Sequence, residues 1–380
     1  MNIIAVDWGK DARKRSAYLA SGTTRTVSQL PFDGSLAQLL VYAEDLLPPV
    51  LVGIDAAIGC PIRTWNDLRR STSATQAGFV DFLLRGPLPD QFFEPVGTPE
   101  EWTPDRPFIQ PPNGRSWSLN AYIEASDNGL YRAIDRRLNA NPMFVTSGMP
   151  GTVGSGTRAL WQELRTETTR SAFHVWPFDG ALGELILAGK PIIAEIYPKA
   201  CYGIALNESL PSQLMSIAKT RKPVREDATA RLMRTHWVAD HGVTIDDTQQ
   251  AIANEDDFDA LFSAAALLRL YLEDAPFESS GPDELCIEGD ILGSGSILAG
   301  NPKTLTPQPD ATRKVAAGKE VSGREYHCPI SGCRHIFRGS CGGWDAHVAS
   351  SKRHPNWHPE VKDPTERKRL FKREFPDFFV

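Results

Sequence analysis

Residues 2–8 read NIIAVDW, a run of apolar and β-branched residues that ends in the carboxylate of Asp7. This composition predicts a strand. Residues 50–56, VLVGIDA, repeat the pattern and carry Asp55 in the same place. Uninterrupted apolar strands are typical of a sheet that is covered on both faces. Ligands of open α/β sheets bind beyond the C-terminal strand ends, so the two acids mark a candidate site.

The pattern on either side of these strands predicts an α/β domain. Two further strands are expected near 16–20 and 24–29, followed by an amphipathic helix over 33–47 that stops before two prolines. Later strands are expected at 172–176 and 191–197, and helices at 224–240 and 255–273. The last of these helices has the clearest apolar periodicity and an acidic first turn, which suits the positive end of the helix dipole.

Two segments interrupt this pattern. Residues 86–118 are dense in proline and aromatic residues and predict an insertion. Its aromatic rings could cover the core or stack on nucleic-acid bases, and we favour the first interpretation. Residues 148–157, GMPGTVGSGT, enter a helix. Phosphate cradling is conceivable there, but the spacing fits neither the P-loop nor the dinucleotide fingerprint, and a structural turn is the favoured interpretation.

Carboxylates at several element ends point to a divalent-metal site. Glu195 lies in the strand expected at 191–197, and Asp256 and Asp259 share one face at the start of the 255–273 helix. Two-metal phosphodiester hydrolysis needs acids from several elements within a few ångströms, and Mg²⁺ or Mn²⁺ prefers such oxygen ligands. Any one of these acids could instead cap a turn or a helix.

Five segments together resemble the domain-of-unknown-function family 429: VDWG (6–9), VGIDAAIGCP (52–61), IAEIYPKACYG (193–203), DDFDALFSAAAL (256–267) and EGDILG (288–293). The resemblance covers residues 1–298 and implies a ribonuclease-H-like mixed sheet with flanking helices and a nuclease activity. It implies Asp7, Asp55, Glu195 and Asp259 as catalytic ligands of Mg²⁺ or Mn²⁺, with Asp256 as an auxiliary. Lys10, just past Asp7, is a further auxiliary candidate for contacting a phosphate.

Two other classes of function fit part of the sequence. VDWGK also resembles the first phosphate motif of the actin-like group of ATP-dependent phosphoryl-transfer enzymes, although the residues after Asp55 match their second phosphate loop poorly. A non-catalytic nucleic-acid-binding or scaffold protein would keep the same fold without cleavage.

Residues 299–322 predict a linker, because they are rich in Pro, Ala, Thr and Lys and lack apolar periodicity. Residues 323–380 predict a zinc finger with a basic tail. Four residues separate Cys328 from Cys333, thirteen separate Cys333 from His347, and six separate His347 from His354. Tetrahedral zinc accepts this ligand set. His358 could replace His354, and Cys341 could also substitute, while Phe337 and Trp344 are the expected small core.

Charge is distributed unevenly along the chain. Residues 301–380 contain 15 Lys and Arg against 9 Asp and Glu, whereas the whole chain has 41 against 47. The basic end, including ERKRLFKREF at 366–375, suits phosphate contact. We therefore expect nucleic acid as a partner, with a protein partner of the finger as the alternative. The absence of a long apolar run or a signal-peptide pattern leads us to expect a cytoplasmic protein without membrane association.

Overall fold

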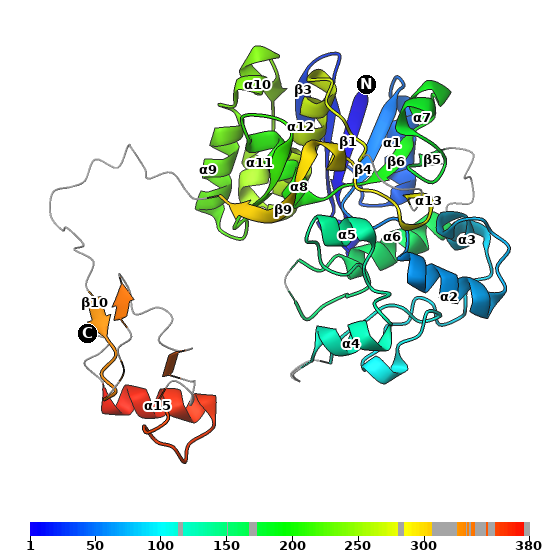
Figure 1. Ribbon diagram of the computed structural model, residues 1–380. Helices are drawn as coiled ribbons and strands as arrows, with labels where there is room; N and C mark the ends of the chain where they lie inside the picture. Colours follow the sequence, from blue (N-terminus) through cyan, green and yellow to red (C-terminus); the bar gives the residue numbers. More distant parts are fainter. Residues whose placement is uncertain are drawn as a thin grey trace, which may run out of the picture. The chain divides into compact units, whose positions relative to one another are not determined.

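Strand β1 (Asn2–Asp7) lies inside a seven-stranded sheet in the computed structural model of the protein (Figure 1). The strand order is β5-β6-β4-β1-β2-β3-β8. The strands after β1 are β2 (Ser16–Ser21), β3 (Thr26–Gln29), β4 (Val50–Ile54), β5 (His174–Val175), β6 (Ile192–Glu195) and β8 (Thr244–Ile245). Strand β2 pairs antiparallel with both β1 and β3. Strands β4, β6 and β5 run parallel to β1. The sheet is therefore mixed.

Both faces of the sheet are buried. Ile3 and Ala5 of β1 belong to one apolar core, and Ile4 and Val6 belong to the other, because successive strand side chains point to opposite faces. Helices α8 (Pro198–Leu206) and α12 (Glu255–Leu272) contribute to the first core, and α1 (Leu36–Asp45), α2 (Ile62–Thr72), α3 (Phe79–Arg85) and α6 (Gly154–Thr166) to the second. The predicted α/β class with flanking helices is confirmed.

Helix α12 matches the helix expected at 255–273. Its first turn is capped by Asn254, whose Oδ1 accepts a hydrogen bond from the backbone nitrogen of Asp256 at 3.1 Å. From Asp257 to Leu270 every residue is buried, as expected of a helix enclosed on all sides. The helix expected at 224–240 is instead two helices, α9 (Lys222–Leu232) and α10 (His236–Asp240).

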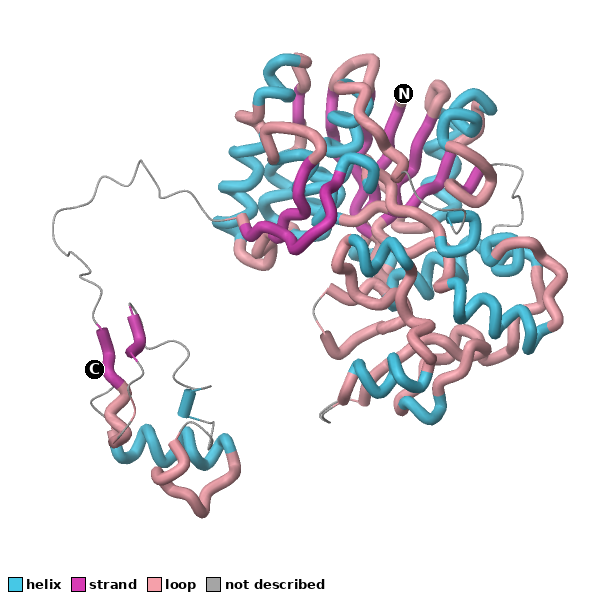
Figure 2. The backbone as a smooth tube through the Cα atoms, viewed as in Figure 1, coloured by secondary structure: helices cyan, strands magenta, loops and turns pink. Residues whose placement is uncertain are grey.

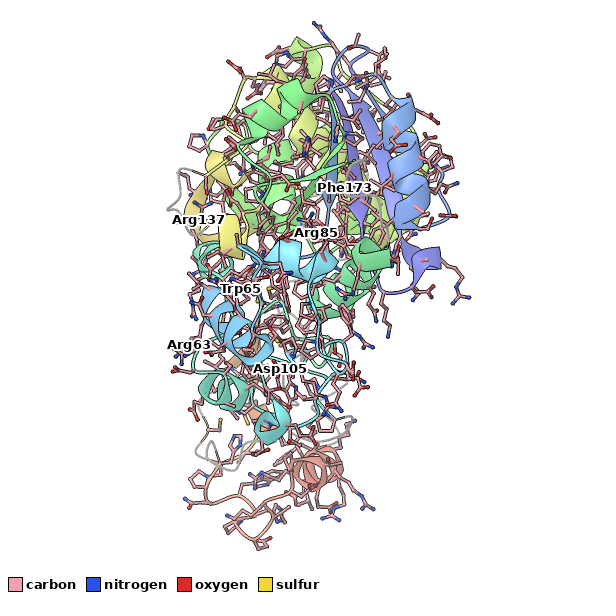
Figure 3. The ribbon with its side chains drawn as sticks, turned by 90° about the vertical axis from the view of Figure 1, so that its right-hand side faces the viewer. Arg63, Trp65, Arg85, Asp105, Arg137 and Phe173 are labelled. Atoms are coloured by element: carbon pink, nitrogen blue, oxygen red, sulfur yellow. The ribbon has the colours of Figure 1, made fainter. Side chains whose placement is uncertain are left out.

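The described part of the insertion at 86–118 contains one short helical turn, η2 (Pro99–Glu101), between loops. Its aromatic rings cover the second core, as favoured from the sequence: Phe92 and Phe108 are almost fully buried and lie beside Trp161 of α6. In the same core, Trp65 of α2, labelled in Figure 3, contacts the rings of Phe79 and Phe82.

The remaining elements before residue 305 connect or extend these layers. A second sheet pairs β7 (Ser212–Ser216) with β9 (Ile297–Thr304) in parallel. The shorter helices are η1 (Ala12–Lys14), α4 (Leu119–Ala125), α5 (Ala133–Arg137), α7 (Leu182–Ala188), α11 (Thr248–Ala253), α13 (Leu285–Glu288) and η3 (Ser294–Ser296). The linker expected at 299–322 therefore starts too early: residues 299–304 belong to β9, because backbone pairing with β7 holds them despite their weak apolar pattern.

The chain divides into two units, Met1–Gln308 and Pro309–Val380. The structure describes residues 1–112, 117–149, 151–166, 173–279, 285–305, 325–331, 333, 336–338, 347–348 and 354–375. Within these ranges, none of the helices combines the length and apolar character that crossing a bilayer requires.

The second unit contains two short antiparallel strands, β10 (Glu325–His327) and β11 (Ile336–Arg338), and the helix α15 (Pro364–Glu374) (Figure 2). Its small core consists of Cys328, Ile330, Val348 and Phe371. Of the expected core residues, Phe337 lies in β11, and Trp344 lies outside the described residues, as does Cys341.

Candidate metal sites

Two neighbouring parallel strands bring the first pair of acids together. Asp7 is the last residue of β1, and Asp55 directly follows β4. The backbone nitrogen of Asp55 donates to the carbonyl oxygen of Val6 at 2.9 Å, and that of Ile196 donates to the carbonyl oxygen of Ile54 at 3.0 Å. Backbone pairing therefore continues to the C-terminal ends of β1 and β4. Both carboxylates lie at this same end of the two strands.

Helix α12 supplies the third acid. Asp259 lies just beyond the capped first turn and is 2% exposed. One carboxylate oxygen each from Asp7, Asp55 and Asp259 lies within 4.8 Å of the others. We call these three residues the aspartate trio. Three separate elements thus present hard oxygen ligands at one point, which is a donor set that Mg²⁺ or Mn²⁺ could use.

Burial and mutual repulsion raise the proton affinity of the trio. Burial, followed by the charges of Asp259 and Asp55, raises the pKa of Asp7 well above its usual range. Burial and the charge of Asp259 raise the pKa of Asp55 to about 8, against the opposing effect of Lys219. Burial also raises the pKa of Asp259. Because the carboxylates disfavour one another's ionised form, a cation bound at this point would stabilise their ionised form.

A lysine that the sequence analysis missed supplies part of that charge. Lys219, in the loop between β7 and α9, forms an ion pair with Asp259, which also accepts a hydrogen bond from the hydroxyl of Tyr202. The pKa of Lys219 is raised: burial lowers it, but the charges of Asp259 and Asp7 outweigh that effect. Tyr202 lies in the IAEIYPKACYG segment, whereas nothing in the local pattern distinguishes Lys219 from a surface lysine.

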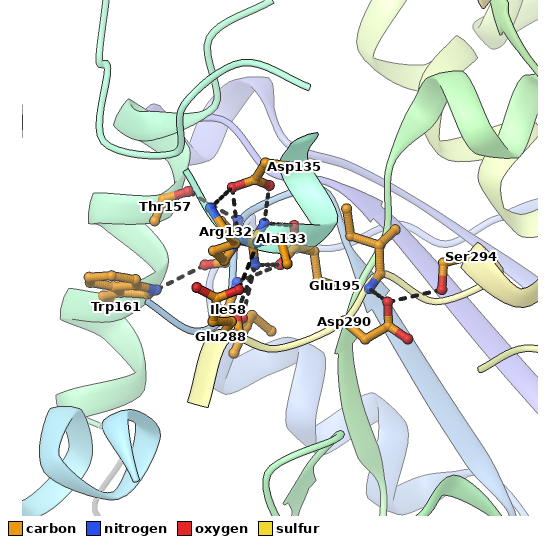
Figure 4. Close-up of polar contacts among 12 residues, drawn as sticks. Ile58, Arg132, Ala133, Asp135, Thr157, Trp161, Glu195, Glu288, Asp290 and Ser294 are labelled. Carbon is orange, nitrogen blue, oxygen red and sulfur yellow. Dashed lines mark hydrogen bonds and ion pairs between the residues drawn. The ribbon is translucent and has the colours of Figure 1, made fainter. Parts of the chain in front are cut away.

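Glu195 is placed differently from the trio. Its two carboxylate oxygens accept hydrogen bonds from Arg132 Nη1 and Nη2 at 2.6 and 2.7 Å, and Oε2 also accepts from the backbone nitrogen of Ile58 at 2.8 Å (Figure 4). Arg132 reaches Asp135 at 2.8 Å as well, and each of the three charged side chains is at most 6% exposed. Glu195 lines the same pocket as the trio. Its carboxylate oxygens, however, are already paired with the guanidinium of Arg132.

The two auxiliary candidates, Asp256 and Lys10, lie in different pockets. Asp256 lines the pocket and is hydrogen-bonded to Asp7, while burial raises its pKa. Lys10 is exposed and lines a different pocket, together with Arg158. The structure thus brings Asp256 to the trio and leaves Lys10 outside the pocket that holds it.

The pocket around the trio has a volume of about 390 Å³. The glycine-rich loop and the first turn of α6 form part of its wall, through Gly151, Thr152, Val153, Ser155 and Gly156. A Cβ atom at position 156 would lie 2.3 Å from the carbonyl oxygen of Trp8, so only glycine lets α6 approach the end of β1 this closely. The loop thus leads the N-terminal, positive end of a 13-residue helix to the wall of the pocket.

The second candidate metal site lies in the C-terminal unit and consists of Cys328, Cys333, His347 and His354. Ligand atoms of all four lie within 4.8 Å of one another. The Sγ atom of Cys328 is 3.7 Å from His354 Nε2, and that of Cys333 is 3.4 Å from His347 Nε2. Two thiolates and two imidazoles are a ligand set typical of structural zinc, so this group could bind a zinc ion.

His358 has other partners. Its Nδ1 lies 3.1 Å from Glu360 and its Nε2 lies 2.6 Å from Glu374. The geometry therefore favours His354 over His358 as the fourth ligand, a choice that the spacing left open.

Helix α15 contains most of the ERKRLFKREF segment and packs into this unit through Phe371. Arg367 is fully buried, and its guanidinium donates to carbonyl oxygens that include those of Val348 and His354. Arg369 and Arg373 are exposed. One of the five basic residues thus holds the backbone around a candidate zinc ligand, while others remain on the surface.

Comparisons with protein-family models, with curated proteins and with solved structures find no match for this chain.

Proposed function

We propose that the first unit is a divalent-metal-dependent nuclease with a ribonuclease-H-like fold. The convergence of Asp7, Asp55 and Asp259 within 4.8 Å carries this proposal. β1 and β4, whose ends hold two of these acids, are neighbours, as the ribonuclease-H-like resemblance requires. Mg²⁺ or Mn²⁺ bound there would polarise a phosphodiester and promote attack by water.

The chain's own residues have distinct roles in this proposal. Asp7, Asp55 and Asp259 hold the ions, and Lys219 offsets the repulsion among the carboxylates. The first turn of α6 faces the negative charge of a phosphate with a positive helix end. Arg132 and Glu195 fix the strand end and the loop at Ile58 beside the trio through three hydrogen bonds of 2.6–2.8 Å.

The C-terminal unit serves as a tethered binding module in the same proposal. A zinc finger joined to an enzyme raises the effective concentration of substrate at the active site without altering the chemistry. The exposed Arg369 and Arg373 on α15 suit contact with phosphates. A protein partner remains the alternative for this module.

The test is cleavage of labelled single- and double-stranded DNA and RNA by the full chain, with Mg²⁺, Mn²⁺ or chelator. We expect metal-dependent cleavage that Asp55→Asn abolishes. The matched control is Asp45→Asn, which alters an exposed acid at the end of α1 and should leave cleavage unchanged. Full activity of Asp55→Asn would refute the metal role of the trio. Binding without cleavage would favour the non-catalytic alternative, and ATP hydrolysis without cleavage the phosphoryl-transfer alternative.

A further inference from the structure

A second pocket adjoins the pocket of the aspartate trio and has the opposite chemical character. It has a volume of about 540 Å³ and is lined by Lys10, Asp11, Gln110, Thr146, Ser147, Ser155, Arg158, Ala159 and Gln162. Apart from Asp11 and Ala159, these side chains carry hydrogen-bond donors. Ser155 lines both pockets. The acidic pocket and the donor-lined pocket therefore meet at the first turn of α6.

The net charge of the donor-lined pocket is positive. Neither Lys10 nor Arg158 forms an ion pair with a carboxylate of the described residues, and the Nε atom of Arg158 is buried without a hydrogen-bond partner there. The one acid, Asp11, is engaged by Arg13, whose Nε and Nη2 atoms lie 3.1 and 2.9 Å from its two oxygens. Among the residues that the structure describes, these two cations thus have no counter-ion.

Chain geometry sets the distance between the two pockets. Lys10 follows Asp7 by three residues, which can span at most roughly 10 Å, and Arg158 follows Ser155 by one turn on the same face of α6. A nucleic-acid strand rises about 3.4 Å per nucleotide. A strand whose phosphodiester lies at the trio would therefore place a phosphate a few nucleotides away at Lys10 and Arg158.

We propose that the donor-lined pocket binds a backbone phosphate of the strand that is cleaved at the trio. This inference rests on the proposed nuclease function and specifies how the substrate is held. Lys10 and Arg158 supply the charge, and the Ser155 hydroxyl lies between the two phosphates. Base edges are not contacted at this subsite, so it adds affinity and register without sequence preference.

The test measures binding of the full chain to a fluorescein-labelled single-stranded oligothymidylate by anisotropy, in chelator so that no strand is cut. Arg158→Gln and Lys10→Gln should each weaken binding several-fold at low salt, and the double variant should reduce the salt slope by about 0.7, the value for one single-strand phosphate contact. Lys14→Gln removes an exposed cation four residues from Lys10 that lies outside the pocket, so it should change neither quantity. Arg158→Lys should retain most of the affinity because it keeps the charge.

Replacing single backbone phosphates of the oligonucleotide with a neutral methylphosphonate identifies the phosphate that lies in the donor-lined pocket. In wild type, replacing the phosphate that lies in the pocket should weaken binding, and in the Lys10→Gln, Arg158→Gln double variant the same replacement should have no further effect. Wild-type affinity and salt slope in a folded double variant would overturn the inference, as would a wild type that does not bind the oligonucleotide. If binding falls as expected but no nucleic acid is ever cut, the phosphate subsite stands and the nuclease proposal fails.

Discussion

Lys219 Nζ forms an ion pair with Asp259 Oδ2, which places an ammonium group beside the aspartate trio. The side chain of Asp259 is 3% exposed and that of Lys219 is 32% exposed, so water can reach the lysine but scarcely the acid. The same carboxylate is a proposed ligand of a divalent cation. Lys219 and that cation therefore act on one carboxylate, and their effects should oppose each other.

Replacing Lys219 with methionine should strengthen metal binding. Lys219→Met keeps a long side chain but removes a positive charge, and unit charges 4 Å apart interact by about 4 kcal/mol at an effective dielectric constant of 20. We expect Mn²⁺ affinity, measured by titration calorimetry, to rise at least about tenfold, since a tenfold change needs only ~1.4 kcal/mol. The melting temperature in chelator should fall, because the acids lose a compensating charge.

Lys199→Met is the matched control for this experiment. Lys199 lines the same pocket, but its Nζ lies 5.9 Å from the ring centre of Tyr197 and makes no ion pair with a carboxylate among the described residues. Its removal should change Mn²⁺ affinity much less. Equal affinities for Lys219→Met and wild type would show that Lys219 and the metal do not share Asp259.

Asp55→Asn should stabilise the metal-free protein while abolishing activity. Desolvation raises the pKa of the half-buried Asp55 to about 8, so at neutral pH folding must protonate a carboxylate that is ionised in the unfolded chain, which costs stability. The amide is nearly isosteric and uncharged. We expect a melting temperature several degrees higher in chelator, at roughly 2–4 °C per kcal/mol for a unit of this size, together with loss of the rise that Mn²⁺ gives to wild type.

The pH dependence of this effect has a defined sign. The folded state binds the proton of Asp55 more tightly than the unfolded state, in which the pKa is near 3.8. The contribution of this group to stability is thus fully present below pH 3.8 and is lost as pH rises toward about 8. Denaturant unfolding in chelator across this window should show wild type losing more stability than Asp55→Asn. Parallel losses would show that Asp55 is not desolvated as the structure indicates.

The positions of Asp7 and Asp55 could be predicted from the sequence because strand direction fixes where the residue after a strand emerges. Asp259 could be predicted because a helix with an acidic first turn places it on a known face. The predictions for residues 86–118 and for α12 depended on equally local signals, namely buried aromatic content and apolar periodicity. Each of these features is set by residues that are close together in the sequence.

The partners of those acids could not be predicted in the same way. Arg132 is 63 positions away from Glu195 along the chain, and the segment that carries it shows no pattern that directs it to a strand end. Lys219 lies in a loop, where neither a strand nor a helix period applies. Sequence patterns therefore indicated which carboxylates lie near the C-terminal ends of the strands. They did not indicate which of these carboxylates is paired with an arginine or a lysine.

Glu195 should contribute to stability more than to metal binding. In Glu195→Gln the buried Arg132 keeps Asp135 but loses the charge of its other partner. Breaking a buried ion pair typically costs about 3–5 kcal/mol. We expect a lower denaturant midpoint with Mn²⁺ affinity within about threefold of wild type, whereas Asp259→Asn should lose Mn²⁺ binding. Normal stability with lost Mn²⁺ binding in Glu195→Gln would return Glu195 to the ligand set implied by the family resemblance.

The histidines of the C-terminal unit should divide into a zinc ligand and a titrating group. Hydrogen bonds that His358 donates to the carboxylates of Glu374 and Glu360 raise its pKa above the usual 6.5. Its contribution to stability is thus present below the unfolded pKa and is lost as pH rises through the folded one. In an NMR titration of the zinc-loaded full chain, His358 should titrate above 6.5, and Glu374→Gln should lower that value.

His354 is buried beside Cys328 and should not titrate in the zinc-loaded chain, because a bound metal keeps imidazole neutral. His354→Ala should therefore lose zinc, measured by metal analysis after dialysis, and with it the ordered unit around Arg367. His358→Ala should retain one zinc ion per chain, since only its contacts to Glu360 and Glu374 are removed. Zinc loss in His358→Ala with retention in His354→Ala would reverse the assignment of the fourth ligand.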